Sequence, residues 1–350
     1  MYKLIFTLAA LAVLAGFSCS PRTEPSLVPA ESTKPAVNTE DEDFGGPVEP
    51  HPVSLPALME KDFNGHSFTV GRVLDDNSVY TRYYITYISG ELKISSIMNV
   101  PKATPPAGGY PLLILNHGYI DTDIYTNGRG LKREQDYLVR QGFVILHPDY
   151  RNHADSDDDD ADVETKFRLG YTEDVINAVL AIRQAKLPYV NADKVGMMGH
   201  SMGGGVTQNV LVVKPDLVQA AVLYAPVSGD YKNNYERYTT RRPEILARII
   251  ATYGEIAGNI EFWANLSASS FYDRIAAPVE IHIGTADKSV EPEWSYAIQA
   301  RLEWLGKPVV LHEYQGEHHE FSRDWTLMMS RIADFFTTEL KTGAGTGETS

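Results

Sequence analysis

Short apolar runs alternate with longer segments of helical period through the middle of the chain. The helical period is clearest at KREQDYLVRQG (132–142) and TEDVINAVLAIRQA (172–185). Runs of this kind are typical of strands buried on both faces of a parallel sheet, with the longer segments as its covering helices. The alternation predicts an α/β fold with a mostly parallel central sheet and helices on both faces. The predicted buried strands are LLILN (112–116), FVILHPD (143–149), KVGMMG (194–199), AAVLYAP (220–226), VEIHIG (279–284) and VVLHEY (309–314).

An antiparallel section is predicted ahead of these strands. YYITYISG (83–90) and LKISSIMNVP (92–101) are rich in Tyr, Ile and Thr, which favour strands. Ser89 and Gly90 provide a turn between them.

The two ends of the chain differ from the middle. Residues 1–19 place Lys3 before an apolar run and then small residues, which is the layout of an export signal. The stretch 20–56 is rich in Pro, Glu, Ser and Thr, so we expect a disordered tether there, and 341–350 is expected to be a flexible tail. The catalytic domain is therefore predicted over 57–340.

The single cysteine of the chain, Cys19, lies at the end of the export signal. This position resembles that of the lipidated cysteine of bacterial lipoproteins, which implies membrane attachment and a place in the cell envelope. Gly16, Phe17 and Ser18 depart from the usual lipoprotein pattern, so ordinary cleavage and a secreted or periplasmic protein remain the alternative. Mass analysis of the mature N-terminus distinguishes the two.

Net charge narrows the list of partners. The formal charge of −15 at pH 7 is unsuited to nucleic acid, whose phosphates call for a basic face. One cysteine also excludes an internal disulfide and a cysteine-based metal site.

The stretch GHSMG (199–203) is the main candidate for chemistry. It follows the predicted strand KVGMMG and precedes the helical segment VTQNVLVVK (206–214), which is the setting of a G-x-S-x-G nucleophile elbow. Its outer glycines permit a tight turn that leaves the Ser201 hydroxyl exposed above the sheet. Ser201 is thus predicted to be a nucleophile.

A serine nucleophile needs a histidine as base and an acid to orient it, in the chain order Ser, acid, His. Asp287 follows the strand VEIHIG and is the favoured acid, and Asp230, one strand earlier, is the alternative. Two adjacent histidines, His318 and His319, follow the last strand, and spacing alone does not choose between them. His282 lies within a strand and is expected in the core.

Four motifs in order resemble the prolyl oligopeptidase and dienelactone hydrolase branch of the α/β hydrolases. They are PLLILNHGY (111–119), GHSMGG (199–204), APVEIHIGTADKSVEPEWS (277–295) and EYQGEHHEF (313–321). The last resembles the family pattern Y-x-G-x-x-H-x-F, which selects His319 as the base and leaves His318 as a loop neighbour. The resemblance also implies an oxyanion hole from the backbone N–H groups of Tyr119, after the strand ending in His117-Gly118, and Met202. It implies no metal or organic cofactor.

The segment after Arg151 departs from the family, because Asn152 and Ala154 stand where glycines are usual. It carries seven carboxylates between Asp155 and Glu164. A solvated acidic loop is the favoured interpretation, and a calcium site is the alternative, since hard cations bind clustered oxygen ligands.

Residues 229–273, here called the lid segment, form an aromatic-rich insertion that we expect to cover the active site as a small helical lid. PEILARIIATYGEIAG (243–258) has helical period and begins with a proline suited to a first turn. Two hypotheses stay open: Arg241 or Arg242 recognises a substrate carboxylate, or the insertion only packs.

The sequence therefore predicts a serine hydrolase that acts through an acyl-enzyme on a small-molecule ester or a short peptide. Full-length prolyl oligopeptidases carry a propeller before the hydrolase domain, whereas here a tether and a short β section precede it, which favours an esterase. The alternatives are a compact prolyl oligopeptidase-like peptidase and, more remotely, a noncatalytic surface binding protein.

Overall fold

The computed structural model describes residues 49–159 and 162–342. They form a nine-stranded sheet in the order β1-β2-β3-β5-β4-β6-β7-β8-β9. The first three strands and the β3–β5 pair are antiparallel, and the pairings from β5 through β4 to β9 are parallel. The strands are β1 (His66–Asp76), β2 (Tyr80–Ser89), β3 (Leu92–Pro101), β4 (Tyr110–Asn116), β5 (Val144–Pro148), β6 (Val190–His200), β7 (Ala220–Tyr224), β8 (Val279–Gly284) and β9 (Val309–Tyr314).

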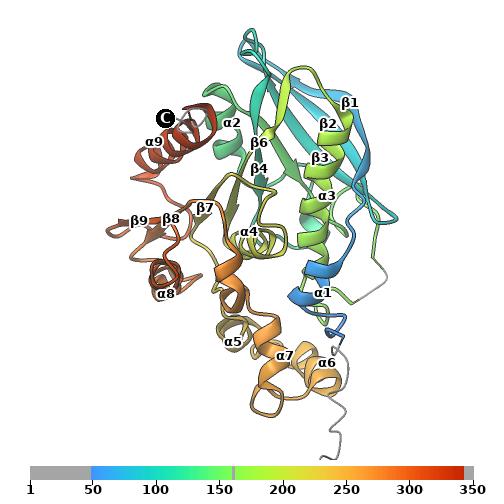
Figure 1. The fold of residues 1–350 in the computed structure, drawn as a ribbon, viewed down its shortest axis with the longest axis vertical. Helices are drawn as coiled ribbons and strands as arrows, with labels where there is room; N and C mark the ends of the chain where they lie inside the picture. The colour runs from blue at the N-terminus through green and yellow to red at the C-terminus, as the bar shows by residue number, and fades with distance from the viewer. Residues whose placement is uncertain (1–48, 160–161, 343–350) are drawn as a thin grey trace, which may run out of the picture. The chain divides into compact units, whose positions relative to one another are not determined.

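Helices cover both faces of this sheet (Figure 1). Helices α3 and α4 pack on one face, while α2 and α9 contact each other and the opposite face. The helices are α1 (Leu55–Glu60), η1 (Thr122–Ile124), α2 (Lys132–Arg140), α3 (Leu169–Ala185), α4 (Met202–Val213), α5 (Tyr231–Asn234), η2 (Tyr235–Thr239), α6 (Pro243–Tyr253), η3 (Ile256–Gly258), α7 (Ile260–Asn265), η4 (Ala268–Arg274), α8 (Pro292–Trp304), α9 (Trp325–Phe336) and η5 (Thr337–Thr342).

Strand β4 shows why the central strands read as unbroken apolar runs. All seven of its residues are buried. Leu112 and Ile114 belong to the core on the α3 and α4 side, whereas Leu113 and Leu115 belong to the core on the α2 and α9 side. Alternate side chains of a strand point to opposite faces, so a strand with helices on both faces is apolar throughout. The predicted fold class is confirmed, and all six predicted segments form strands. VVLHEY was wrongly predicted to be buried: β9 lies at the sheet edge, and only Tyr314 of its six residues is buried.

The antiparallel section is also confirmed, with one strand more than predicted. Strands β2 and β3 form a hairpin whose turn places Gly90 at φ 64°. The extra strand, β1, pairs with β2 at the sheet edge and is exposed over most of its length. Neither face of β1 is buried along most of the strand, so its apolar and polar residues do not alternate. The pattern of apolar positions therefore did not predict this strand.

The lid segment forms a group of short helices that Figure 1 shows beyond α4, around the labels α5, α6 and α7. Aromatic rings hold it together, with Tyr253 stacked on Phe262 at 4.5 Å between centroids. Helix α6 begins at Pro243, as its sequence predicts.

The predicted export signal, including Cys19, lies outside the described residues, as does most of the predicted tail. Within the segment predicted as a tether, helix α1 begins at Leu55, and the side chains of Ser54 and Leu55 are buried. Across residues 49–159 and 162–342, no helix combines the length and apolar character needed to cross a bilayer.

Candidate active site

Ser201 lies between β6 and α4 in a strained turn. Its φ of 56° and ψ of −120° are rare for a residue with a side chain. Its N–H donates to the Tyr224 carbonyl at 3.1 Å, and its own carbonyl accepts from Gly204 at 2.9 Å and Val227 at 3.1 Å. These backbone hydrogen bonds hold the turn against β7 and the loop after it, and against the first turn of α4.

The two glycines beside Ser201 are required by contact, not only by conformation. A Cβ on Gly199 would lie 2.1 Å from the Gly203 carbonyl oxygen. A Cβ on Gly203 would lie 2.0 Å from the carbonyl oxygen of Asn116 on β4. Real side chains do not tolerate such distances, so the helix can approach the sheet only with glycine at both positions.

Asp287 and His319 meet at the carboxyl ends of β8 and β9. His319 Nδ1 donates to Asp287 Oδ2 at 2.7 Å. The other carboxylate oxygen accepts from the backbone N–H groups of Ser289 at 2.8 Å and Val290 at 3.1 Å. Asp287 is thus oriented by its own loop, and the structure brings together the pair that the sequence predicted.

A buried carboxylate that sequence analysis passed over orders the histidine loop. Both oxygens of Glu317 accept backbone N–H groups, from Ser322 at 2.9 Å and Asp324 at 2.7 Å. The N–H of Phe321 donates to the Tyr224 hydroxyl at 2.8 Å. Glu317 lies within the GEHHEF motif, next to the two histidines that are candidates for the base. A charged residue in that motif was the only sequence signal for its role.

His200 connects the serine turn to the histidine loop. Its Nε2 donates to the His319 carbonyl at 3.2 Å, and the two imidazole rings lie 4.5 Å apart. Burial, with a smaller effect of the neighbouring His319, lowers the pKa of His200 to about 3. His200 is therefore neutral. Through it, the residue that precedes Ser201 in the chain contacts His319.

The competing candidates lie elsewhere. Asp230 is exposed and caps α5, where it accepts the Lys232 N–H at 2.9 Å. His318 is exposed, and its Nδ1 donates to the Ala286 carbonyl at 3.0 Å. His282 is fully buried, with its Nε2 2.7 Å from Glu280 Oε1, as expected for a core residue.

The loop after β4 approaches Ser201 closely. A Cβ on Gly118 would lie 3.1 Å from the Ser201 Cβ, so the backbone of this loop passes directly beside the serine. His117 is buried and stacks on Tyr150 at 4.3 Å, and burial lowers its pKa to about 4. Met202 is the first residue of α4, where a backbone N–H has no acceptor within the helix.

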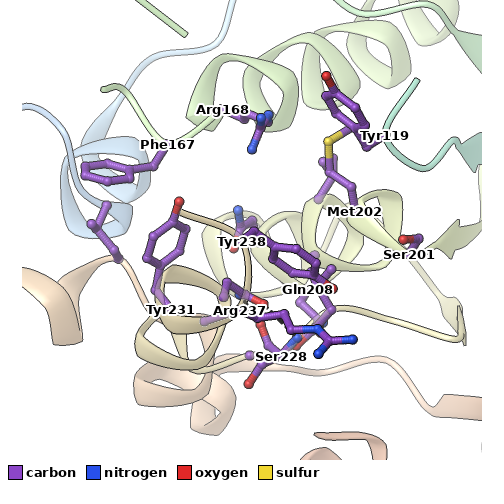
Figure 2. A pocket seen from close by; sticks show the side chains of 18 of the residues that line it. Tyr119, Phe167, Arg168, Ser201, Met202, Gln208, Ser228, Tyr231, Arg237 and Tyr238 are labelled. Atoms are coloured by element: carbon purple, nitrogen blue, oxygen red, sulfur yellow. Dashed lines mark hydrogen bonds between the residues drawn. The ribbon is translucent and has the colours of Figure 1, made fainter. Parts of the chain in front are cut away.

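A pocket of about 390 Å³ opens beside Ser201. Figure 2 shows Ser201 on one side of it and Phe167 and Tyr231 on the other, with Arg168 and Arg237 between. Its walls come from the loop after β4, the segment that leads into α3, helix α4, the loops after β7 and β8, and the lid segment. The remaining lining residues include Tyr119, Leu169, Met202, Gly205, Val206, Gln208, Asn209, Val227, Ser228, Gly229, Asn234, Tyr238, Arg241, Arg242, Leu266, Ala268 and Ser289.

The acidic segment forms ion pairs with neighbouring arginines. Asp159 pairs with Arg151 at 2.8 Å, and Glu164 pairs with Arg242 at 2.9 Å. In the described part of the chain, no group of three or more His, Cys, Asp or Glu residues is arranged to hold a metal ion.

Taken together, a mostly parallel sheet with a serine elbow after β6, an acid after β8 and a histidine after β9 defines an α/β hydrolase.

The sequence profile of the prolyl oligopeptidase family matches residues 130–343. The chain therefore belongs to the prolyl oligopeptidase family and is a serine hydrolase. A relative named an uncharacterized peptidase, YtmA of Bacillus subtilis, is 25% identical over 239 residues, which cover 68% of this chain and 86% of the relative.

A peptidase and an esterase are among the solved structures that share the fold. The acylaminoacyl peptidase of Pyrococcus horikoshii superposes with a TM-score of 0.64 at 18% identity, covering 78% of this chain and 43% of that one. Acetyl xylan esterase 1 of Thermoanaerobacterium superposes with a TM-score of 0.62 at 18% identity, covering 80% and 92%. Peptidases and esterases thus share this architecture, and the fold alone does not separate the two activities.

Proposed function

We propose that this protein is an esterase in which Ser201, His319 and Asp287 form the catalytic triad. The observation that carries the proposal is the 2.7 Å hydrogen bond between Asp287 and His319, at a sheet edge that also holds the strained Ser201 turn. Strain at a serine between two such glycines, on a turn beside a pocket, is typical of a nucleophile.

The proton transfer follows from the tautomer. Since Asp287 accepts the proton on His319 Nδ1, Nε2 carries the lone pair of the neutral ring. That nitrogen takes the Ser201 proton as the hydroxyl oxygen attacks the ester carbonyl. It then returns the proton to the leaving alcohol, and an acyl-enzyme remains. Water, activated by the same histidine, releases the acid and restores Ser201.

The tetrahedral intermediates need donors for their oxyanion. The N–H groups of Tyr119 and Met202 are proposed for this role, because one follows the Gly118 loop beside Ser201 and the other begins α4. Loss of one such donor typically slows the reaction by about 10²–10³-fold. Preorganised backbone donors also keep this part of the site independent of side-chain identity.

The pocket chemistry favours esters over peptides with a free amino terminus. An ammonium group in a pocket needs a carboxylate partner, and none of the lining residues that the structure describes is acidic. A peptidase is the second candidate, supported by the family and by the relative named as a peptidase.

The deciding experiment compares kcat/KM for p-nitrophenyl acyl esters and Xaa-Pro p-nitroanilides, using the full-length chain and Ser201→Ala. We expect ester turnover that falls by about 10⁴-fold or more in the variant, with little anilide cleavage. Efficient anilide cleavage identifies a peptidase instead. Folded wild-type protein that no fluorophosphonate labels would show that Ser201 is not a nucleophile, as in a noncatalytic binding protein.

A further inference from the structure

The charge of the pocket beside Ser201 is opposite to that of the whole chain. The chain carries a formal net charge of −15 at pH 7. Four arginines nevertheless line the pocket: Arg168, Arg237, Arg241 and Arg242. Among the described residues, its lining includes no Asp, Glu or Lys. A cationic pocket in an acidic protein attracts anionic groups to one place.

Three of these arginines are held by carboxylates that stand outside the lining. Arg242 pairs with Glu164 at 2.9 Å, and Arg168 pairs with the same oxygen of that carboxylate. Arg237 pairs with Glu291 at 3.0 Å and also donates to the Lys288 carbonyl at 2.5 Å. Two carboxylates therefore face four guanidinium groups, and the pocket retains an excess of positive charge.

Arg241 is the arginine that differs. Among the residues that the structure describes, it makes no ion pair, hydrogen bond or ring contact, although it lines the pocket. Its side chain is exposed. A guanidinium presents five N–H donors in a planar fork that matches a carboxylate. Arg241 thus has its full donor set available to a bound molecule.

The rest of the pocket is suited to an apolar body. Phe167 and Tyr231 pack edge to face at 5.1 Å between centroids, and Figure 2 shows both across the pocket from Ser201. Met202, Val206 and Leu266 add aliphatic surface. A substrate that fills this space has an apolar or aromatic part between the ester at Ser201 and any charged end.

We propose that Arg241 selects substrates that carry a carboxylate, so that the protein acts on acidic esters with an apolar body. The inference rests on the proposed esterase function and names its substrate class. Arg241 binds the substrate carboxylate bidentately, while Arg168, Arg237 and Arg242, already paired, shape the cationic wall. The sequence left Arg241 and Arg242 as equal candidates, and the ion pair of Arg242 with Glu164 separates them.

The test measures kcat/KM for p-nitrophenyl half-esters of dicarboxylic acids, from glutarate to suberate, against straight-chain acyl esters of matched length. A second comparison, of acetoxybenzoate with its methyl ester, places the charge on the leaving group instead of the acyl group. We expect at least one charged ester to be preferred by about 10- to 100-fold, the range for a charge-assisted pair. The preference should fall in high salt, because Arg241 is exposed.

Arg241→Gln should abolish this preference, measured within the variant as the ratio of kcat/KM for the charged ester to that for the neutral ester of matched length. Arg241→Lys should retain part of it, since an ammonium keeps the charge but lacks the fork. The matched control is Arg248→Gln on α6, because Arg248 pairs with Asp162 at 3.4 Å and does not line the pocket. Equal kcat/KM for charged and neutral esters, or a preference unchanged in Arg241→Gln, overturns the proposal.

A binding measurement keeps this inference separate from the proposed activity. In Ser201→Ala protein, calorimetry should find phenylvalerate bound at least about 10-fold more tightly than phenylpentanol, with the difference lost when Arg241→Gln is added. Failure of the esterase function appears instead as absent ester turnover and absent fluorophosphonate labelling in the wild type. Equal binding of the acid and the alcohol contradicts carboxylate selection even if esters are hydrolysed.

Discussion

The carboxyl ends of the parallel strands, here called the sheet edge, and the lid segment hold their functional side chains by different means. At the sheet edge, backbone hydrogen bonds fix the Ser201 turn and the Asp287 carboxylate, and glycines at 199 and 203 admit no side chain. In the lid segment, every arginine except Arg241 is held by an ion pair with a residue from a distant part of the chain, such as Glu164 for Arg242. The first region is set by close packing of main chain, and the second by contacts between long, partly exposed side chains.

The difference assigns different tasks to the two regions. Chemistry depends on angles and distances that backbone geometry keeps constant, so the sheet edge is suited to the reacting groups. Partly exposed ion pairs contribute little stability each and exchange partners readily. If the proposed triad and the proposed role of Arg241 hold, substitutions in the lid segment should change substrate choice while the reaction stays the same.

The largest expected effect is on kcat, and it distinguishes the two candidate acids, Asp287 at the sheet edge and Asp230 in the lid segment. Asp287→Asn should lower kcat by about 10⁴-fold, because an amide favours the wrong tautomer of His319. Asp230→Asn, its matched control at the start of the lid segment, should leave kcat within about 3-fold, since this residue only caps α5. Steady-state kinetics with a p-nitrophenyl ester measures both, and a larger loss in Asp230→Asn would reverse the assignment.

A second comparison uses one glycine from each region. Gly203→Ala should lower the free energy of unfolding by about 3 kcal/mol, because its Cβ would meet the Asn116 carbonyl oxygen at 2.0 Å. Gly258→Ala, in the lid segment, should leave it unchanged or raise it by up to about 1 kcal/mol, since nothing lies within 4 Å of its Cβ. Urea unfolding decides: equal stability of the two variants would mean that the elbow is not tightly packed.

The sequence predicted the sheet edge well because its determinants are local. The elbow is read from five consecutive residues at 199–203, and the family register selected His319, which the hydrogen bond to Asp287 matches. The central strands were found because helices bury both of their faces, which leaves an apolar run. Strand β1 was missed for the opposite reason, since it is mostly exposed.

The pocket walls could not be predicted, because their determinants are far apart in the chain. Arg241 and Arg242 are neighbours with the same chemistry, and only the Glu164 carboxylate, 78 residues before Arg242, distinguishes them. The same holds for Phe167, whose ring packs against that of Tyr231, 64 residues later, on the side of the pocket opposite Ser201. No periodicity or motif carries such pairings.

The smallest expected effect is a fall in the free energy of unfolding at acidic pH that comes from a buried histidine. It concerns the sheet region, since the lid segment, residues 229–273, contains no histidine. The pKa of His200 falls from its ordinary 6.5 to about 3 on folding. Between these values the unfolded chain binds more protons than the folded one, so the free energy of unfolding falls as the pH falls. At pH 5 the contribution of His200 to this loss should be about 1–2 kcal/mol relative to pH 7.

Urea unfolding of the wild type and His200→Asn at both pH values measures this contribution. The variant should lose about 1–2 kcal/mol less than the wild type on acidification, whatever its stability at pH 7, because asparagine has no proton to bind. His318→Asn is the comparison, since it removes an exposed imidazole from the neighbouring loop. Equal pH dependence in the wild type and His200→Asn would mean that His200 can be protonated in the folded protein, and the contact between the serine turn and the histidine loop would then be open to water.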